Sequence, residues 1–145
     1  MTNKRKAIIL LMTVVVLTFV SSCRALRPPE SCGLGGNANE TGYGLYFEKL
    51  DLLDVSGSPG IPDRDGLPRF EEGQALNLWL QVKSDTRVRV CVEETRGGGE
   101  IAYDETTPLA SGQNAITLGI LESGPYVLRM SIDGTLVRSV PFSVR

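Results

Sequence analysis

The chain of 145 residues contains no histidine. Histidine is the commonest general base near neutral pH, the usual partner of a serine or cysteine nucleophile and the commonest transition-metal ligand. Beyond residue 22 only two lysines remain, Lys49 and Lys83, so a serine–lysine pair also has few candidates. These absences favour a non-catalytic protein that needs no cofactor.

Basic residues are also scarce. Of the 15 lysines and arginines in the chain, three lie at positions 4 to 6, and the chain has 17 aspartates and glutamates. Beyond the N-terminal segment, 12 basic residues therefore face 17 acidic ones, and they form no cluster. Binding to nucleic acid or to an anionic lipid surface needs a basic patch. The charge pattern excludes a nucleic acid partner.

No apolar stretch is long enough to span a bilayer. The longest, residues 7–20, has 14 residues, whereas a spanning helix needs about 20. It follows Lys4, Arg5 and Lys6 and ends in Val20-Ser21-Ser22-Cys23. Charge, apolar run and small residues in this order are typical of a secretory signal. The last four residues resemble the lipobox of bacterial lipoproteins, an aliphatic residue and two small residues before the lipidated cysteine.

This resemblance covers residues 1–23. It implies that residues 1–22 are a signal peptide that is removed and that Cys23 carries a diacylglyceryl group. Two or more acyl chains are enough to hold a protein stably at a membrane. Arg24 stands where an aspartate would retain a lipoprotein in the inner membrane. The expected location is therefore the cell envelope: the outer membrane if the organism has one, otherwise the outer face of the plasma membrane.

The other two cysteines, Cys32 and Cys91, form an even pair once Cys23 is lipidated. Because an exported protein meets an oxidising compartment, we predict a disulfide between them, with two free thiols as the alternative. Such a bridge would close a loop of about 60 residues, which the chain-entropy account values at roughly 4 kcal/mol.

Residues 23–43, rich in glycine, asparagine, proline and serine, predict the lipidated cysteine followed by a flexible tether. In residues 44–145 apolar and polar residues alternate, with frequent turns and no predicted helix. The strand candidates are residues 45–53, 76–82, 87–93, 101–103, 116–120, 126–132 and 137–144. This pattern predicts an all-β fold, a single immunoglobulin-like β-sandwich of about seven antiparallel strands.

The last two strand candidates make a checkable prediction about pairing. Asp133-Gly134 indicates a two-residue hairpin loop, which places Met130 opposite Val137 and Val137 in the core. A β-bulge near Arg138-Ser139 would reconcile Val137 with the opposite alternation of the residues that follow. Pro141 lacks an N–H group and indicates that the last strand is unpaired there on one side.

The motif Leu121-x-x-Gly124-x-Tyr126-x-Leu128 resembles the start of the penultimate strand in many immunoglobulin-like and fibronectin type III-like domains. There the tyrosine forms a "tyrosine corner" with the backbone a few residues upstream. The resemblance covers residues 44–145 and implies a fold rather than a function. The surroundings of Trp79 differ from those of the tryptophan in a true immunoglobulin domain, since no inter-sheet cysteine pair flanks it.

The candidate binding residues are Trp79, Arg87 and Arg89. If Leu76, Leu78 and Leu80 face the core, Trp79 faces outward, and large outward aromatic residues can anchor partners. The alternative is that Trp79 covers the stems of the arginines or the tether. Cys91 has the same outward alternation, so a bridge to Cys32 would bring the tether across this face.

Two patterns of acidic residues point to other chemistry. Asp63, Asp65 and Glu72 match positions 3, 5 and 12 of an EF-hand loop, but Ile61 stands at position 1, so a polar turn is favoured over a calcium site. A glycosidase needs two carboxylates that face each other. The doublets Glu71-Glu72, Glu93-Glu94 and Asp104-Glu105 do not provide this, because neighbours on a strand point to opposite faces.

The sequence thus favours a lipid-anchored, non-catalytic module of the cell envelope that binds an envelope protein or a glycan. Three alternatives stay open. One is a structural subunit of an envelope or secretion assembly, joined through sheet edges. Another is a protease inhibitor that acts through the loops of the sandwich. The third, which the composition favours least, is a hydrolase.

Overall fold

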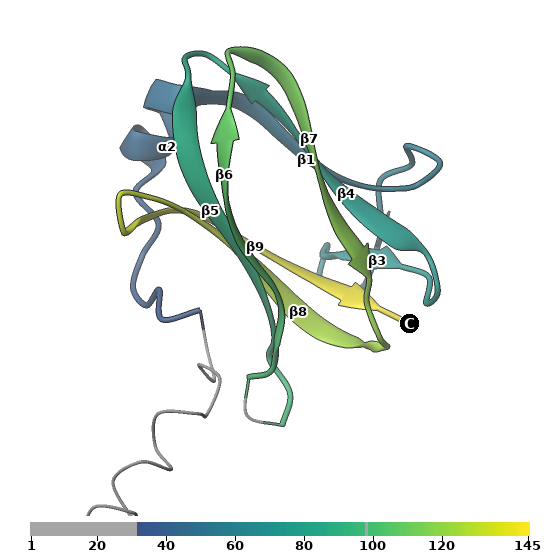
Figure 1. Ribbon diagram of the computed structural model, residues 1–145. Helices are drawn as coiled ribbons and strands as arrows, with labels where there is room; N and C mark the ends of the chain where they lie inside the picture. The colour runs from purple at the N-terminus through teal and green to yellow at the C-terminus, as the bar shows by residue number, and fades with distance from the viewer. Residues whose placement is uncertain (1–31, 98) are drawn as a thin grey trace, which may run out of the picture.

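The computed structural model describes residues 32–97 and 99–145; the predicted signal peptide and Cys23 lie outside this range. The described elements are the helix α2 (Glu40–Tyr46) and the strands β1 (Phe47–Asp54), β2 (Ile61–Pro62), β3 (Pro68–Phe70), β4 (Ala75–Val82), β5 (Thr86–Glu94), β6 (Ile101–Leu109), β7 (Gly112–Ile120), β8 (Gly124–Ile132) and β9 (Thr135–Val144). They form a three-stranded sheet, β1-β4-β7, and a six-stranded sheet, β2-β3-β9-β8-β5-β6 (Figure 1). Among these elements, none is a helix long and apolar enough to cross a bilayer.

The core lies between the two sheets and follows the alternation in the sequence. On β4 the four inward side chains are each at most 2% exposed: Leu76, Leu78, Leu80 and Val82. On β5 the inward side chains are equally buried: Val88, Val90 and Val92. Burial of each such side chain stabilises the fold by about 1.5–3 kcal/mol. The prediction of two half-buried strands here is confirmed.

Apart from the short strands β2 and β3, one sheet has the order β1-β4-β7 and the other the order β9-β8-β5-β6. This is the strand order of an immunoglobulin-like sandwich. All seven predicted strands are present, as β1 and β4 to β9. The short strands β2 and β3 bring the total in the described part to nine.

The short strand β3 corrects the prediction that all strands are antiparallel. It pairs parallel with the end of β9, through Arg69 with Ser143 and Phe70 with Val144. In the described sheet, β3 pairs with β9 only at Ser143 and Val144, so Pro141 pairs on one side only, with Val127 of β8. The one-sided pairing expected from the missing N–H group of Pro141 is confirmed.

The tyrosine corner predicted from the sequence is present at the start of β8. The hydroxyl group of Tyr126 donates a 2.9 Å hydrogen bond to the carbonyl oxygen of Glu122, four residues upstream. The ring is 5% exposed and stacks on Phe142 of β9, with 5.5 Å between ring centroids. This bond fixes the path of the chain as it crosses from the three-stranded sheet to the six-stranded one.

The hairpin between β8 and β9 is confirmed, but its register differs by one residue. Asp133 and Gly134 form the two-residue loop, with φ angles of 49° and 77°. Met130 pairs with Arg138 rather than with Val137, because the bulge lies one position earlier than expected. Val137 is nevertheless 3% exposed and part of the core, as predicted.

The structure corrects the prediction of a tether that extends to residue 43. Within this segment Asn39 begins helix α2: its side chain accepts a hydrogen bond from the amide of Gly42 at 2.9 Å. The amide of Asn39 donates another, also 2.9 Å, to the carbonyl oxygen of Leu136 on β9. A seven-residue helix with two glycines has poor intrinsic propensity, so the sequence pattern predicts no helix. Capping and contact with β9 stabilise it instead.

Candidate functional site

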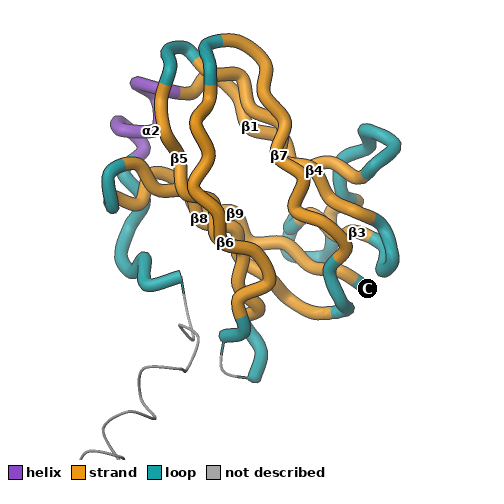
Figure 2. Tube along the Cα trace, viewed as in Figure 1, coloured by secondary structure: helices purple, strands orange, loops and turns teal. Residues whose placement is uncertain are grey.

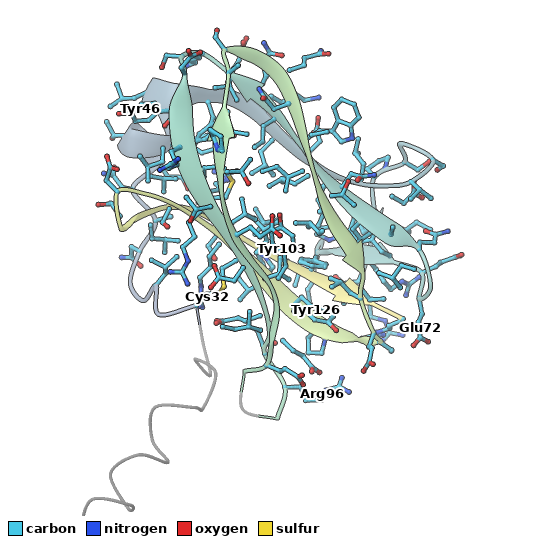
Figure 3. All side chains as sticks on the ribbon, in the orientation of Figure 1. Cys32, Tyr46, Glu72, Arg96, Tyr103 and Tyr126 are labelled. Atoms are coloured by element: carbon cyan, nitrogen blue, oxygen red, sulfur yellow. A yellow bond between two sulfur atoms is a disulfide. The ribbon has the colours of Figure 1, made fainter. Side chains whose placement is uncertain are left out.

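The outer face of the six-stranded sheet holds the N-terminal segment of the described chain. Cys32 forms a disulfide bond with Cys91 of β5, with 5.9 Å between their Cα atoms (Figure 3). Cys91 has the outward alternation expected of it, yet its exposure is 0%. The predicted disulfide is therefore confirmed. The prediction that it brings the tether across the face of Trp79 is wrong, because β5 and the strand of Trp79, β4, belong to different sheets.

Charged side chains reinforce the attachment of Cys32. The amide of Cys32 donates a 2.7 Å hydrogen bond to the carboxylate of Glu93, which also pairs with Arg129. The guanidinium group of Arg89 donates a 3.2 Å hydrogen bond to the carbonyl oxygen of Cys32 and two of 2.7 Å to Asp104. These bonds hold the pKa of Asp104 below its ordinary value. Arg89 is thus engaged within the protein.

Helix α2 contacts β9 and β1 at the end of the sandwich, where Tyr43 and Tyr46 pack against the core between the sheets (Figure 2). Arg138 of β9 pairs with Glu40 at 2.7 Å, and its guanidinium group lies 5.0 Å from the centre of the Tyr43 ring. Tyr43 in turn stacks on Phe47, with 5.3 Å between ring centroids. On the outer face of the six-stranded sheet the disulfide-bonded segment covers Cys91 and Glu93, whereas Arg87, Ser139 and Pro141 stay exposed.

The outer face of the three-stranded sheet is more open. Strand pairing arranges its outward residues in three rows, which are Lys49-Gln81-Gln113, Asp51-Trp79-Ala115 and Leu53-Asn77-Thr117. Trp79 stands at the centre of the middle row and is 41% exposed. Its neighbour Ala115 is small, so the indole ring remains accessible from the side of β7.

A shallow pocket of about 120 Å³ lies beside the indole ring of Trp79. Its other walls come from all three strands and are mostly polar: Lys49, Asp51, Leu80, Gln81 and Gln113. The ammonium group of Lys49 lies 2.7 Å from the carboxylate of Asp51, and both side chains are exposed enough that this ion pair adds little stability. The pocket therefore combines one flat apolar surface with donors and acceptors of hydrogen bonds.

The predicted surface of Trp79, Arg87 and Arg89 does not exist as one surface. Trp79 lies on β4 and the arginines lie on β5, and these strands belong to different sheets. Outward side chains of the two strands therefore point in opposite directions. The alternative that Trp79 covers the arginine stems or the tether is wrong for the same reason.

Sequence reasoning did not find the residues that surround Trp79. Asp51 lies on β1, where the alternation of apolar residues is ambiguous, and Gln113 lies at the start of β7, before the apolar residues that predict that strand. Gln81 has the same outward alternation as Trp79 on β4, so the sequence alone could have predicted that it lies beside Trp79. The cross-strand pairing that brings Asp51 and Gln113 to the same place could not be predicted from alternation.

For Asp63, Asp65 and Glu72 the sequence favoured a polar turn over a calcium site, and the structure shows a turn. One carboxylate oxygen of Asp63 accepts hydrogen bonds from the amides of Asp65 at 2.9 Å and Leu67 at 3.0 Å, which makes it the cap of the turn between β2 and β3. The amide of Glu72 pairs with the carbonyl oxygen of Arg145, beyond the end of β9. Within residues 32–97 and 99–145, no group of three or more cysteine and carboxylate side chains is placed to hold a metal ion.

The acidic doublets on β5 and β6 point to opposite faces, as predicted. Glu93 lies under Cys32 on the outer face, whereas Glu94 lines a pocket at the end of the sandwich. On β6, Asp104 binds Arg89, whereas Glu105 accepts a 3.1 Å hydrogen bond from the hydroxyl group of Tyr103. Burial and this bond to Glu105 raise the pKa of Tyr103 to about 12, so the phenol remains a neutral donor.

The pocket that Glu94 lines has a volume of about 290 Å³ and lies between the start of β6 and the end of β7. Its lining includes three carboxylates, from Glu94, Glu100 and Glu122, and no basic residue. Tyr126 also lines it, and burial raises the pKa of its hydroxyl group. That hydroxyl is already used in the tyrosine corner, so it is committed to the fold.

Comparison with known proteins finds no matching protein family and no matching curated protein. Among solved structures, the chain is similar to a β-glucosidase from Listeria innocua in complex with gluconolactone, with a TM-score of 0.36, 11% identity, and coverage of 66% of this chain and 16% of the enzyme. It is also similar to a β-D-glucoside glucohydrolase from Trichoderma reesei, with a TM-score of 0.36, 10% identity, and coverage of 68% and 18%. The chain thus spans less than a fifth of the length of either enzyme.

Proposed function

We propose that the mature chain is a lipid-anchored, non-catalytic module of the cell envelope that binds its ligand around Trp79. The observation that carries the proposal is the exposure of Trp79 at the centre of a three-stranded sheet. Part of the outer face of the other sheet is covered by the segment of Cys32. An exposed indole at the centre of a sheet face resembles the aromatic anchors of binding interfaces.

The position of Cys32 supports the orientation that this function needs. Cys32 is fixed to the outer face of the six-stranded sheet, only nine positions after the proposed lipid-bearing Cys23. The anchor therefore joins the sandwich on the face opposite Trp79. A ligand of the envelope could then approach Trp79 from the side away from the anchoring membrane.

The anchor itself is testable with Cys23→Ser. An alkyne fatty acid fed to the cells should label the wild-type chain and leave the variant unlabelled and uncleaved, because the serine hydroxyl does not replace the thiol that accepts the lipid. Labelling of the variant at the wild-type level would refute the anchor while leaving the Trp79 site untouched.

The lining of the Trp79 pocket favours a glycan as the ligand. A pyranose ring presents a flat face of C–H groups that can pack on an indole ring, and its hydroxyl groups both donate and accept hydrogen bonds. The amides of Gln81 and Gln113 and the carboxylate of Asp51 line the same pocket as the indole and supply donors and acceptors for those hydroxyls. A protein ligand would instead be expected to meet a larger apolar patch.

The test compares Trp79→Ala with Arg87→Ala in the full-length chain. Both side chains are exposed, but they lie on opposite sheets, so the arginine variant is a matched control. We expect Trp79→Ala to abolish sedimentation with purified cell-wall sacculi and retention on immobilised envelope polysaccharides, and Arg87→Ala to retain both. Equal binding by Trp79→Ala would refute the site, and binding only to an envelope protein would replace the glycan with a protein ligand.

A further inference from the structure

Three of the four sheet edges carry features that prevent pairing with another strand. Strand β1 is densely charged, with the sequence FEKLDLLD. Strand β2 has only two residues and ends in Pro62. Strand β6 has Pro108, and Glu105 points inward beside Val90. Charges, proline, short length and inward-pointing charged residues are the usual means by which proteins protect sheet edges.

Strand β7, the fourth edge, lacks these features. Its nine residues, GQNAITLGI, include no charged residue and no proline, and the uncharged run extends from Thr106 to Leu121. Gly112 and Gly119 have φ angles of 110° and 88°. From Gly112 to Thr117 the strand pairs residue by residue with β4, and Leu118 is the extra residue of a bulge that ends this regular part. In the described sheet order no strand follows β7 on the other side.

This part of β7 is suited to pairing. Ile116 and Leu118 face the core and hold the strand in place, while Gln113, Ala115 and Thr117 face outward and are exposed. A six-residue, uncharged segment with β-branched residues has the composition of strands that add to another sheet. The edge therefore offers a row of backbone groups with nothing in its side chains to repel a strand.

We propose that β7 pairs antiparallel with β7 of a second copy of this chain, which joins two three-stranded sheets into one of six strands. A second copy fits because a two-fold axis at Ala115 would place Gln113 opposite Thr117 of the partner and put no charge opposite a like charge. The same operation at Glu105, the central residue of β6, would place two carboxylates opposite each other, which destabilises a cross-strand pair. The proposal does not depend on the ligand of Trp79.

One geometric consequence follows from this register. Trp79 pairs with Ala115, so the row across the joined sheet would read Trp79, Ala115, and then the second copy's alanine and tryptophan at the same positions. Three strand spacings put the two indole rings about 14 Å apart on one face. The pair would present two copies of the Trp79 pocket side by side, which raises avidity for a repeating ligand.

Cysteine cross-linking in native membranes tests the proposal on the full-length chain. Ala115→Cys is compared with Thr106→Cys, since both residues are exposed on edge strands but only Ala115 lies on β7. We expect mild oxidation to give a disulfide-linked dimer from Ala115→Cys and little from Thr106→Cys. Equal cross-linking at the two positions would overturn the proposal. A product with a mass other than twice that of the chain would assign the edge to a strand of another protein and also overturn it.

A second comparison uses charge. Ala115→Lys places two lysines opposite each other at the two-fold axis, and we expect dimerisation of the detergent-solubilised chain to weaken about tenfold or more, whereas Thr106→Lys leaves it unchanged. Sedimentation velocity measures both, and circular dichroism confirms that each variant is folded. A wild-type chain that stays monomeric at every concentration tested would refute the pairing.

Discussion

The amide of Cys32 donates a 2.7 Å hydrogen bond to the carboxylate of Glu93, two residues along β5 from the cysteine to which Cys32 is bonded. Glu93 is 7% exposed, and Arg129 balances its charge. A buried carboxylate is costly without such partners. The disulfide holds the amide of Cys32 beside Glu93, and this amide and Arg129 together offset the cost of burying the carboxylate. The N-terminal segment is therefore part of the folded domain from Cys32 onward.

Removal of the disulfide should weaken this attachment without abolishing the fold. Cys91 lies outside the apolar cluster between the sheets, so we expect Cys32→Ser/Cys91→Ser to fold with a stability loss of up to about 4 kcal/mol. Urea unfolding with and without reductant measures the loss in the wild-type chain. Limited proteolysis should then cut residues 33–39 faster in the reduced protein. Unchanged stability on reduction would show that the bridge does not form.

The tyrosine corner can be divided into its hydrogen bond and its packing. We expect Tyr126→Phe to cost about 0.5–1.5 kcal/mol, because it removes only the bond to Glu122, and Glu122 is exposed enough for water to replace it. Tyr126→Ala also removes a ring that stacks on Phe142, and it should cost about 3–5 kcal/mol. Denaturant midpoints of the two variants measure both values. Equal losses would mean that the bond, and not the ring, dominates.

The ion pair between Arg89 and Asp104 should make stability depend on acid. The bonds from Arg89 lower the pKa of Asp104 in the folded state, so the unfolded chain takes up the proton first as the pH falls. The contribution is complete above the ordinary pKa of an aspartate, about 3.9, and is lost as the pH falls through the folded value below it. The difference in urea midpoint between wild type and Asp104→Asn should shrink between pH 6 and pH 3. A difference that stays constant over this range would contradict the ion pair; Asp133→Asn, on an exposed hairpin, is the control.

The sequence predicts most of the fold because each signal acts over a short distance. Alternation of leucine and valine predicts β4 and β5, Asp133-Gly134 predicts the last hairpin, and Tyr126 predicts the corner. Each of these depends on residues within one strand or one turn. The disulfide between Cys32 and Cys91 spans 59 positions, yet it was predictable because only two thiols were left to pair.

The parts that were not predictable depend on contacts between distant segments. Helix α2 has a poor helical sequence and exists because Asn39 caps it and Arg138 contacts it. The separation of Trp79 from Arg87 depends on which strand starts a new sheet, and alternation along a strand does not reveal this. The pocket beside Trp79 likewise needs the register between β1, β4 and β7. The sequence therefore predicted the central residue of the candidate site but not its neighbours.

Trp79 is the only tryptophan in the chain, so intrinsic fluorescence reports on the candidate site alone. Its indole ring is 41% exposed, and an indole in contact with water emits at longer wavelengths than a buried one. We expect the emission of the folded chain to lie close to that of the unfolded chain, and acrylamide to quench both efficiently. Binding of a glycan over the indole should shift the emission to shorter wavelengths and protect it from acrylamide.

The same measurement separates the Trp79 site from pairing through β7. Self-association at Ala115 leaves the outward face of β4 uncovered, so dilution of the free chain should not change the emission, whereas saturation with ligand should. Emission typical of a buried indole in the free, folded chain would place Trp79 under cover and remove the basis of the proposed site.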